Sequence, residues 1–224
     1  MIVSIHQPNY LPYLGFFHKM ANSDVLVLYD TAQFSKNDYH NRNRIKTPRG
    51  AEWLTVPVRR PLLRTIGEIE VARGPWPEKH RMTLEANYRR SPFFFSFINE
   101  LSSEWSRTGA LLALMNAGLI ARVARWLKIE TRVIPASRLS VAETTNPTEK
   151  ILHLVEECGG DTYLSGQGGR SYLDESKFSR IALRYDPFVV SEYPQQFGTF
   201  VPNLSIVDAI FNCGDAAAEL VERK

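Results

Sequence analysis

Short apolar runs alternate with amphipathic stretches at both ends of this chain. Residues 2–6 form a short apolar run, residues 24–29 form a continuous one, and residues 12–21 between them carry apolar side chains at helical spacing. A run that is apolar on both faces is typical of a buried parallel strand. Two such runs with a helix between them predict a βαβ unit.

The last third of the chain repeats this alternation. The pattern predicts strands at residues 131–136, 162–166 and 187–193 and helices at residues 174–183 and 204–211, the last capped by Asn203. A further helix is expected to start at Asn146-Pro147, because asparagine is a favoured N-cap and proline a favoured first residue, and to stop at Gly159-Gly160. We therefore predict an α/β fold: an open, mostly parallel Rossmann-like sheet with helices on both faces.

The middle of the chain has a different pattern. Residues 53–58 and 65–72 predict a more exposed hairpin, and residues 75–128 predict a mainly helical lobe or insertion. We expect one α/β domain over residues 1–224 that includes this lobe.

Composition narrows the class of protein. Hydrophobic residues make up 44% of the chain and charged residues 23%, which indicates a packed core. The two cysteines form no CxxC pair, residues 1–5 look like a core strand rather than a signal peptide, and no run of about 18 apolar residues occurs. We expect a cytoplasmic protein without a membrane span. The net charge of +3 is too small to indicate a nucleic-acid partner.

The end of the first predicted strand carries candidate chemistry. In sheets of this type ligands bind at the carboxyl ends of the strands, where His6, Gln7 and Asn9 lie. Histidine can act as a general base near neutral pH, and Asp30 at the end of the second strand is our candidate for orienting it. The alternative is a turn whose polar side chains bond their own backbone.

A dense polar block follows Asp30. Arginine and lysine in such a block are suited to hold phosphate or carboxylate groups, although a solvated basic loop would have the same composition. The candidate binding residues are Gln33, Lys36, Asn41, Arg42, Asn43, Arg44 and Lys46.

Two later segments are weaker candidates. A glycine loop after a predicted strand lets backbone amides approach an anion, and a polar and aromatic segment near residue 200 could close over a substrate or be an ordinary packed turn. The candidates are Ser165, Gly166, Gly168, Gly169, Tyr193, Gln195 and Asn203. The five histidines form no HxH or HExxH pair, so we expect no metal site.

Four segments resemble the WbqC-like protein family. They are HQPNYLPYLGFFHKM, DxxQFSKxxYxNRNRIKTxxGxxWLTVPV, YLSGxGGxxYLD and FVPxLSIxDxIFNxG, and in this order they cover most of the chain. The resemblance implies a bacterial cytoplasmic protein that acts in O-antigen or other surface-polysaccharide (lipopolysaccharide) biosynthesis. A second, fold-level similarity is to the nucleotidylyltransferases with an HxGH motif. Here neither histidine of that motif is kept, because the matching residues are Pro12 to Phe16.

These observations lead to one main hypothesis and two alternatives. We expect a transferase that adds an acyl or aminoacyl group to an amino-sugar nucleotide, with His6 as general base or acid and Asp30 beside it. The donor would be an acyl carrier protein, a CoA thioester or an ATP-derived acyl group, and no other cofactor is expected. The alternatives are a non-catalytic nucleotide-sugar-binding protein and a nucleotidyltransferase-like enzyme with a degenerate HxGH motif.

Overall fold

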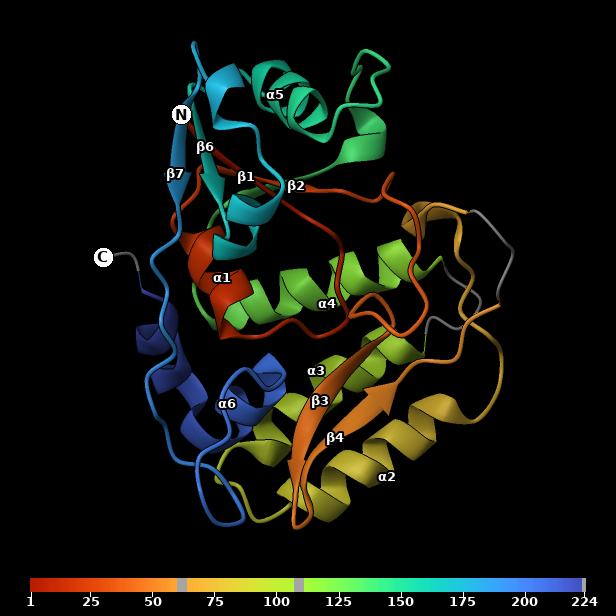
Figure 1. Ribbon diagram of the computed structural model, residues 1–224. Coiled ribbons are helices and arrows are strands. Elements are labelled where there is room, and N and C mark those ends of the chain that lie inside the picture. Colours follow the sequence, from red (N-terminus) through yellow and green to blue (C-terminus); the bar gives the residue numbers. More distant parts are fainter. Residues whose placement is uncertain (60–63, 107–110, 223–224) are drawn as a thin grey trace.

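A five-stranded parallel sheet forms one end of the molecule (Figure 1). The computed structural model describes residues 1–59, 64–106 and 111–222. The strands are β1 (Ile2–His6), β2 (Val25–Leu28), β5 (Arg132–Pro135), β6 (Thr162–Ser165) and β7 (Ala182–Tyr185), in the order β5-β2-β1-β6-β7. The predicted open, mostly parallel sheet is confirmed. Because the chain first builds outward from β1 on one side and later on the other, strand order reverses between β1 and β6.

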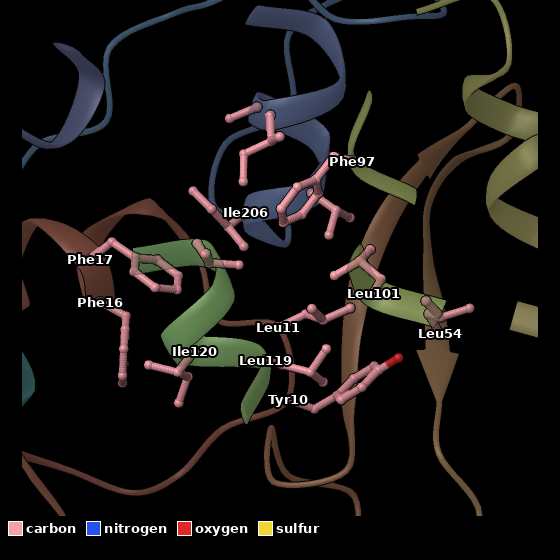
Figure 2. Close-up of a cluster of buried hydrophobic side chains, with 14 of the residues drawn as sticks. Tyr10, Leu11, Phe16, Phe17, Leu54, Phe97, Leu101, Leu119, Ile120 and Ile206 are labelled. Atoms are coloured by element: carbon pink, nitrogen blue, oxygen red, sulfur yellow. The ribbon is translucent and has the colours of Figure 1, made fainter. Parts of the chain in front are cut away.

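Helices cover both faces of this sheet because its side chains alternate between two apolar clusters. Leu26 and Leu28 face α1 (Leu14–Ala21) and α4 (Leu112–Trp126), whereas Val25 and Val27 face α5 (Pro147–Glu157). Figure 2 shows the larger cluster, in which side chains of α1 and α4 meet the segment that follows β1. The labelled members are Tyr10, Leu11, Phe16, Phe17, Leu54, Phe97, Leu101, Leu119, Ile120 and Ile206.

A two-stranded hairpin lies beyond the carboxyl ends of the sheet strands (Figure 1). It consists of β3 (Arg42–Thr47) and β4 (Gly50–Thr55), with α2 (Trp76–Tyr88) and α3 (Phe94–Trp105) nearby. The prediction that residues 53–58 pair with residues 65–72 holds only at Val58, because residues 50–55 pair with residues 42–47 instead. Residues 66–68 form a short 3-10 helix, η1 (Ile66–Glu68), and a single isolated bridge joins Val58 to Val71. The dense charge of residues 42–46 concealed an alternation that buries Asn43 and Ile45.

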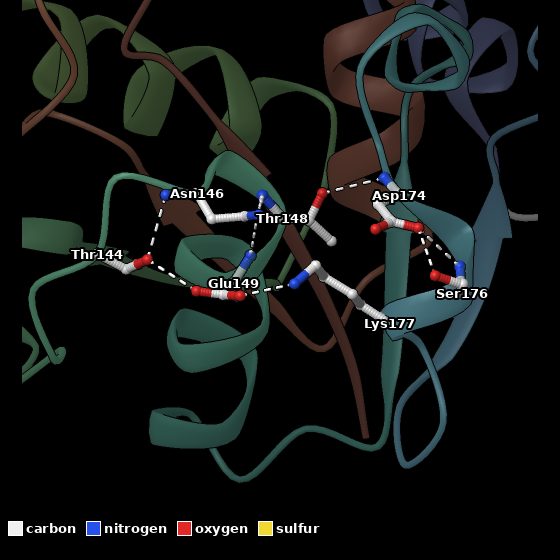
Figure 3. Close-up of polar contacts among 7 residues, drawn as sticks. All are labelled: Thr144, Asn146, Thr148, Glu149, Asp174, Ser176 and Lys177. Atoms are coloured by element: carbon white, nitrogen blue, oxygen red, sulfur yellow. Dashed lines mark hydrogen bonds and ion pairs between the residues drawn. The ribbon is translucent and has the colours of Figure 1, made fainter.

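The start of α5 is held by a polar cluster shown in Figure 3. The Asn146 side chain accepts from the backbone N–H groups of Thr148 and Glu149, as the sequence predicted. Thr148 Oγ1 accepts from the N–H of Asp174 at 3.0 Å, and Lys177 Nζ lies 2.6 Å from Glu149 Oε1. These contacts tie α5 to η4 (Glu175–Lys177).

The structure corrects two further predictions in the last third. Residues 174–183 are not a helix, because Asp174 caps only the short η4 and residues 182–185 join the sheet as β7; residues 187–193 are irregular. The last helix, α6 (Ile206–Cys213), has Ser205 rather than Asn203 as its N-cap, and it ends at Gly214 with φ of 57° as expected. Three short helices complete the described chain: η2 (Ala136–Arg138), η3 (Gln167–Ser171) and η5 (Gly214–Val221). No helix in the described ranges is both long and apolar enough to cross a bilayer.

Candidate functional site

A cleft of about 1100 Å³ opens at the carboxyl ends of β1 and β6. Its position is the point at which strand order reverses, where ligands bind in open α/β sheets. The lining combines polar groups, two cationic side chains and several tyrosines. It includes His6, Gln7, Asn9, Tyr13, Lys19, Tyr29, Tyr39, Asn43, Arg44, Tyr163, Gly166, Gly168, Gly169, Tyr172, Asp186 and Asn203.

His6 is partly buried at the end of β1 and presents one ring nitrogen for a ligand. Its Nδ1 lies 3.0 Å from the carbonyl oxygen of Gln7, which can only accept, so Nδ1 carries the proton and Nε2 has the free lone pair. Burial, and secondarily the charge of Lys19, lowers the pKa of His6 to about 3. The imidazole is therefore neutral at pH 7.

Lys19 is a cleft residue that sequence reasoning missed. It lies in α1 at 5% exposure, and its Nζ donates to the carbonyl oxygen of Ile5 at 3.0 Å. Burial lowers the pKa of Lys19 to about 8, although the charge of Asp186 opposes this shift. A lysine among the apolar residues of a predicted helix was the available signal, since an ammonium in such a position must find polar partners.

Arg44 brings a second cation to the cleft from β3. Its Nε is buried and has no hydrogen-bond partner among the described residues, and within those residues no carboxylate pairs with its guanidinium. Asn43 holds the adjoining backbone: its Nδ2 donates to the carbonyl oxygen of Leu11 at 2.7 Å, and Leu11 has a positive φ of 42°. Arg42 and Asn41 lie outside the lining. Arg42 stacks on Trp53, and Asn41 donates to the Val56 carbonyl at 2.7 Å.

Gln7 and Asn9 lie next to His6 in the lining, as expected. Gln7 Oε1 accepts from His40 Nε2 at 3.0 Å, and His40 Nδ1 accepts from the N–H of Ser35 at 3.3 Å, which fixes the tautomer of this buried histidine. Asn9 Oδ1 is buried and has no partner among the described residues. Gln7 therefore has its amide N–H groups left for a ligand, and Asn9 keeps an unused acceptor.

The glycine loop contributes its backbone to the opposite wall. Gly166, Gly168 and Gly169 line the cleft, and a Cβ at Gly169 would lie 2.1 Å from Ser165 Oγ. Ser165 itself is 1% exposed and donates to the Gly166 carbonyl at 3.0 Å, so it is a packing residue outside the lining.

Lys46, Tyr193 and Gln195 meet in a separate buried network. Lys46 Nζ donates to Gln195 Oε1 at 3.0 Å and to the Thr199 carbonyl oxygen. The network continues through Tyr88, whose hydroxyl donates to Asp208 Oδ2 at 2.7 Å, and burial raises the pKa of that carboxyl. None of these side chains is in the cleft lining.

Asp30 lies outside the cleft lining. Its carboxylate accepts from the backbone N–H and the hydroxyl of Ser137 at 2.9 and 2.6 Å, and no described hydrogen bond joins it to His6. Gln33 and Lys36 are exposed and likewise outside the lining. Asn203 is in it, at a positive φ of 56°.

A carboxylate does pair with a histidine elsewhere at this edge. Asp186, directly after β7, has Oδ1 2.8 Å from Nδ1 of His18. Asp186, Phe188 and Val189 line both the main cleft and a second cavity of about 520 Å³ behind it. The sequence did not reveal this pair because β7 was predicted as part of a helix. Among the described residues, no cluster of three or more histidine, cysteine or acidic side chains could hold a metal ion.

Comparison with known proteins finds one family and one relative. The sequence matches the WbqC-like protein family over residues 7–220. An uncharacterized protein of Mycobacterium tuberculosis, Rv1507c, is 33% identical over 225 residues, which cover 97% of this chain and 96% of the relative. No solved structure matches the chain, so the similarity to nucleotidylyltransferases stays a prediction.

Proposed function

This chain belongs to the WbqC-like protein family, and we propose that it is a transferase that adds an acyl or aminoacyl group to an amino-sugar nucleotide during surface-polysaccharide synthesis. The observation that carries the proposal is the free Nε2 of His6 in a cleft that also holds the cations Lys19 and Arg44. Such a cleft offers an acceptor for the proton of an attacking amine next to positive charge suited to phosphates.

The phosphates of the substrate would bind to Lys19 and Arg44. Lys19 uses one N–H for the Ile5 carbonyl, which leaves two for a ligand, and Arg44 has no carboxylate partner among the described residues. The backbone of Gly166 and Gly168 faces the same space without side chains in the way. Arg42 and Lys46, which the sequence also offers as phosphate ligands, are left out because Arg42 stacks on Trp53 and Lys46 donates to Gln195.

The chemical step follows from this placement. The lone pair of the sugar amine attacks the carbonyl carbon of the donor, and His6 Nε2 accepts the amine proton. The new C–N bond forms while the C–S or C–O bond to the carrier breaks, and the proton passes from His6 to the leaving group. The amide of Gln7 could donate to the oxyanion of the tetrahedral intermediate.

Substrate binding would make His6 a better base. The charge of Lys19 is one cause of the low pKa of His6. A phosphate bound to Lys19 would offset that contribution, so the pKa of His6 rises towards its usual value when the cleft is loaded.

The test is product formation by the full chain. UDP-, dTDP- and GDP-linked amino sugars are incubated with acyl carrier protein thioesters, acyl-CoA, or ATP with amino acids, and the mixtures are examined by mass spectrometry. In the pair that reacts, His6→Ala should lower turnover about 100-fold with binding retained. His153→Ala, on α5 and outside the cleft lining, is the matched control. Unchanged turnover in His6→Ala would rule out the base.

A second candidate is a protein that binds the nucleotide sugar without catalysis. The observation that favours it is the burial of His6, which lowers its pKa to about 3 and makes the imidazole a weak base. Binding of nucleotide sugars without product from any donor would support this function.

A further inference from the structure

An exposed aromatic pair continues the cleft along the outer face of the β3–β4 hairpin. Tyr39 lines the cleft and is 37% exposed, and Trp53 on β4 is 44% exposed. Their ring centroids lie 5.6 Å apart and their planes are inclined at 58°, so a planar group that stacks on one ring meets the other with its edge. Neighbouring exposed aromatic rings beside a cleft form a surface whose burial is favourable, and such surfaces are typical of ligand or partner contacts.

The hairpin register places Trp53 next to a cation of the cleft. Arg44 and Trp53 are directly paired across the two strands, so their side chains leave the hairpin on the same face. Arg42, two residues before Arg44, shares that face, and its guanidinium carbon lies 4.0 Å from the centroid of the Trp53 ring. Arg42 also donates to the Asn37 carbonyl oxygen, which helps to fix the stack. The indole is therefore held in place before any ligand arrives.

The groups of the cleft and of the adjoining hairpin correspond to the parts of a nucleotide sugar. His6 and the Lys19 ammonium lie at the end of β1, Arg44 on the hairpin pairs with Trp53 across the strands, and the Trp53 ring contacts Tyr39. With the sugar amine at His6 and the phosphates at Lys19 and Arg44, the nucleoside is the part of the substrate left for the aromatic pair, because Trp53 is the cross-strand neighbour of Arg44.

We infer that Tyr39 and Trp53 form the subsite for the aromatic base of the nucleotide, which stacks on the exposed indole of Trp53 with its edge against Tyr39. The inference rests on the proposed function, and it narrows the substrate from any phosphorylated amino sugar to one linked to a nucleotide. Bases stack on aromatic side chains with little dependence on their identity, so this subsite recognises a nucleotide without selecting one base strongly.

Tryptophan fluorescence provides a direct test. Trp76 and Trp105 are buried and Trp126 is partly buried, so Trp53 is the tryptophan that a ligand can reach most readily. The full chain is titrated with UDP, GDP and inorganic pyrophosphate. UDP and GDP should quench the emission and pyrophosphate should not. Trp53→Phe keeps an aromatic face, so it should abolish the quenching while the affinity for UDP stays within about twofold.

Calorimetric titration of alanine variants supplies the second arm. Trp53→Ala should weaken UDP binding about tenfold, because the base loses its stacking partner, and Tyr39→Ala should also weaken it, because the base loses the ring against its edge. Both variants should leave pyrophosphate binding unchanged. Phe95→Ala is the matched control, since Phe95 is 65% exposed on α3 and outside the cleft lining. It should change neither affinity.

The outcomes separate this inference from the proposed function. Equal affinity for UDP in the wild-type chain and in Trp53→Ala and Tyr39→Ala would overturn the subsite while leaving the transferase intact. If Tyr172→Ala weakens UDP binding and the other two variants do not, the base lies at the opposite rim of the cleft and the inference is overturned. A loss confined to UDP-linked sugars, with UDP unaffected, would assign the pair to the sugar ring. If neither UDP nor pyrophosphate binds, the proposed function fails together with the inference.

Discussion

The ammonium of Lys19 donates to the carbonyl oxygen of Ile5 at 3.0 Å. Because His6 directly follows Ile5, this contact fixes a positive charge beside the imidazole. Burial is the main cause of the low pKa of His6, and Lys19 is the second. The same lysine that is suited to hold an anion therefore also keeps the imidazole neutral.

Replacing Lys19 by methionine should raise the pKa of His6 above its value of about 3 while leaving it below 6.5, because burial remains. The change is measured by following the His6 ring resonances in an NMR titration. Pyrophosphate affinity should fall in the same variant. Lys79→Met, an exposed lysine on α2, is the control. An unmoved His6 titration would show that Lys19 does not act on the imidazole.

His80 should make the fold sensitive to acid. Its Nε2 donates to the Thr55 carbonyl and its Nδ1 accepts from the Tyr10 hydroxyl, each at 3.0 Å, and burial lowers its pKa to about 4. Below pH 6.5 His80 becomes protonated in the unfolded chain but stays neutral in the folded chain. Stability is therefore complete above pH 6.5 and falls as the pH drops towards 4, by up to about 1.4 kcal/mol per pH unit.

The measurement is urea unfolding of wild type and His80→Gln between pH 7 and pH 4.5. The variant should have a lower free energy of unfolding at pH 7 and a shallower decline with acid. Parallel declines in the two proteins would contradict the assignment to His80.

Gly169→Ala should destabilise the chain by about 1–3 kcal/mol, since the new Cβ would overlap Ser165 Oγ at 2.1 Å and press on Leu173 at 3.0 Å. Gly168→Ala is the matched control, because nothing lies within 4 Å of a Cβ there. The measurement is the melting temperature of each variant, which should be lower for Gly169→Ala than for Gly168→Ala. A difference of less than one degree between them would mean that the loop adjusts freely.

Tyr88→Phe should cost about 1–3 kcal/mol of folding free energy. The lost hydroxyl donates to Asp208 Oδ2 and accepts from the N–H of Lys46, each at 2.7 Å, so its removal leaves two buried groups short of a partner. Denaturant unfolding measures the loss. Tyr185→Phe, whose hydroxyl bonds Glu175 near the surface, should cost much less. Equal effects of the two substitutions would argue against a buried network.

The parallel sheet could be predicted because its strands are apolar on both faces and are separated by helix signals. The hairpin could not, because Arg42, Arg44 and Lys46 share one face and their charge hid the buried alternation of Asn43 and Ile45. The edge strand β7 was also missed, because its side chains alternate between exposed and partly buried positions and so give no continuous apolar run.

Of the candidate site, the residues next to a predicted strand end were the easiest to place. His6, Gln7, Asn9 and the glycines follow directly from the sheet rule. The polar block after Asp30 gave the right composition but not the side-chain directions, so Lys46 and Asn41 turned inward to other partners while Arg44 reached the cleft. Lys19 was signalled only by its place among the apolar residues of a helix, and the position of Asp186 depends on tertiary packing, which no local pattern encodes.

The segment from Asp186 to Val189 separates the main cleft from the second cavity, and Asp186, Phe188 and Val189 face both. A ligand that displaces these shared side chains from one side reshapes the space on the other. Occupancy of the two cavities is then thermodynamically linked. If a ligand in one cavity changes the affinity for a ligand in the other by some factor, the second ligand changes the affinity for the first by the same factor.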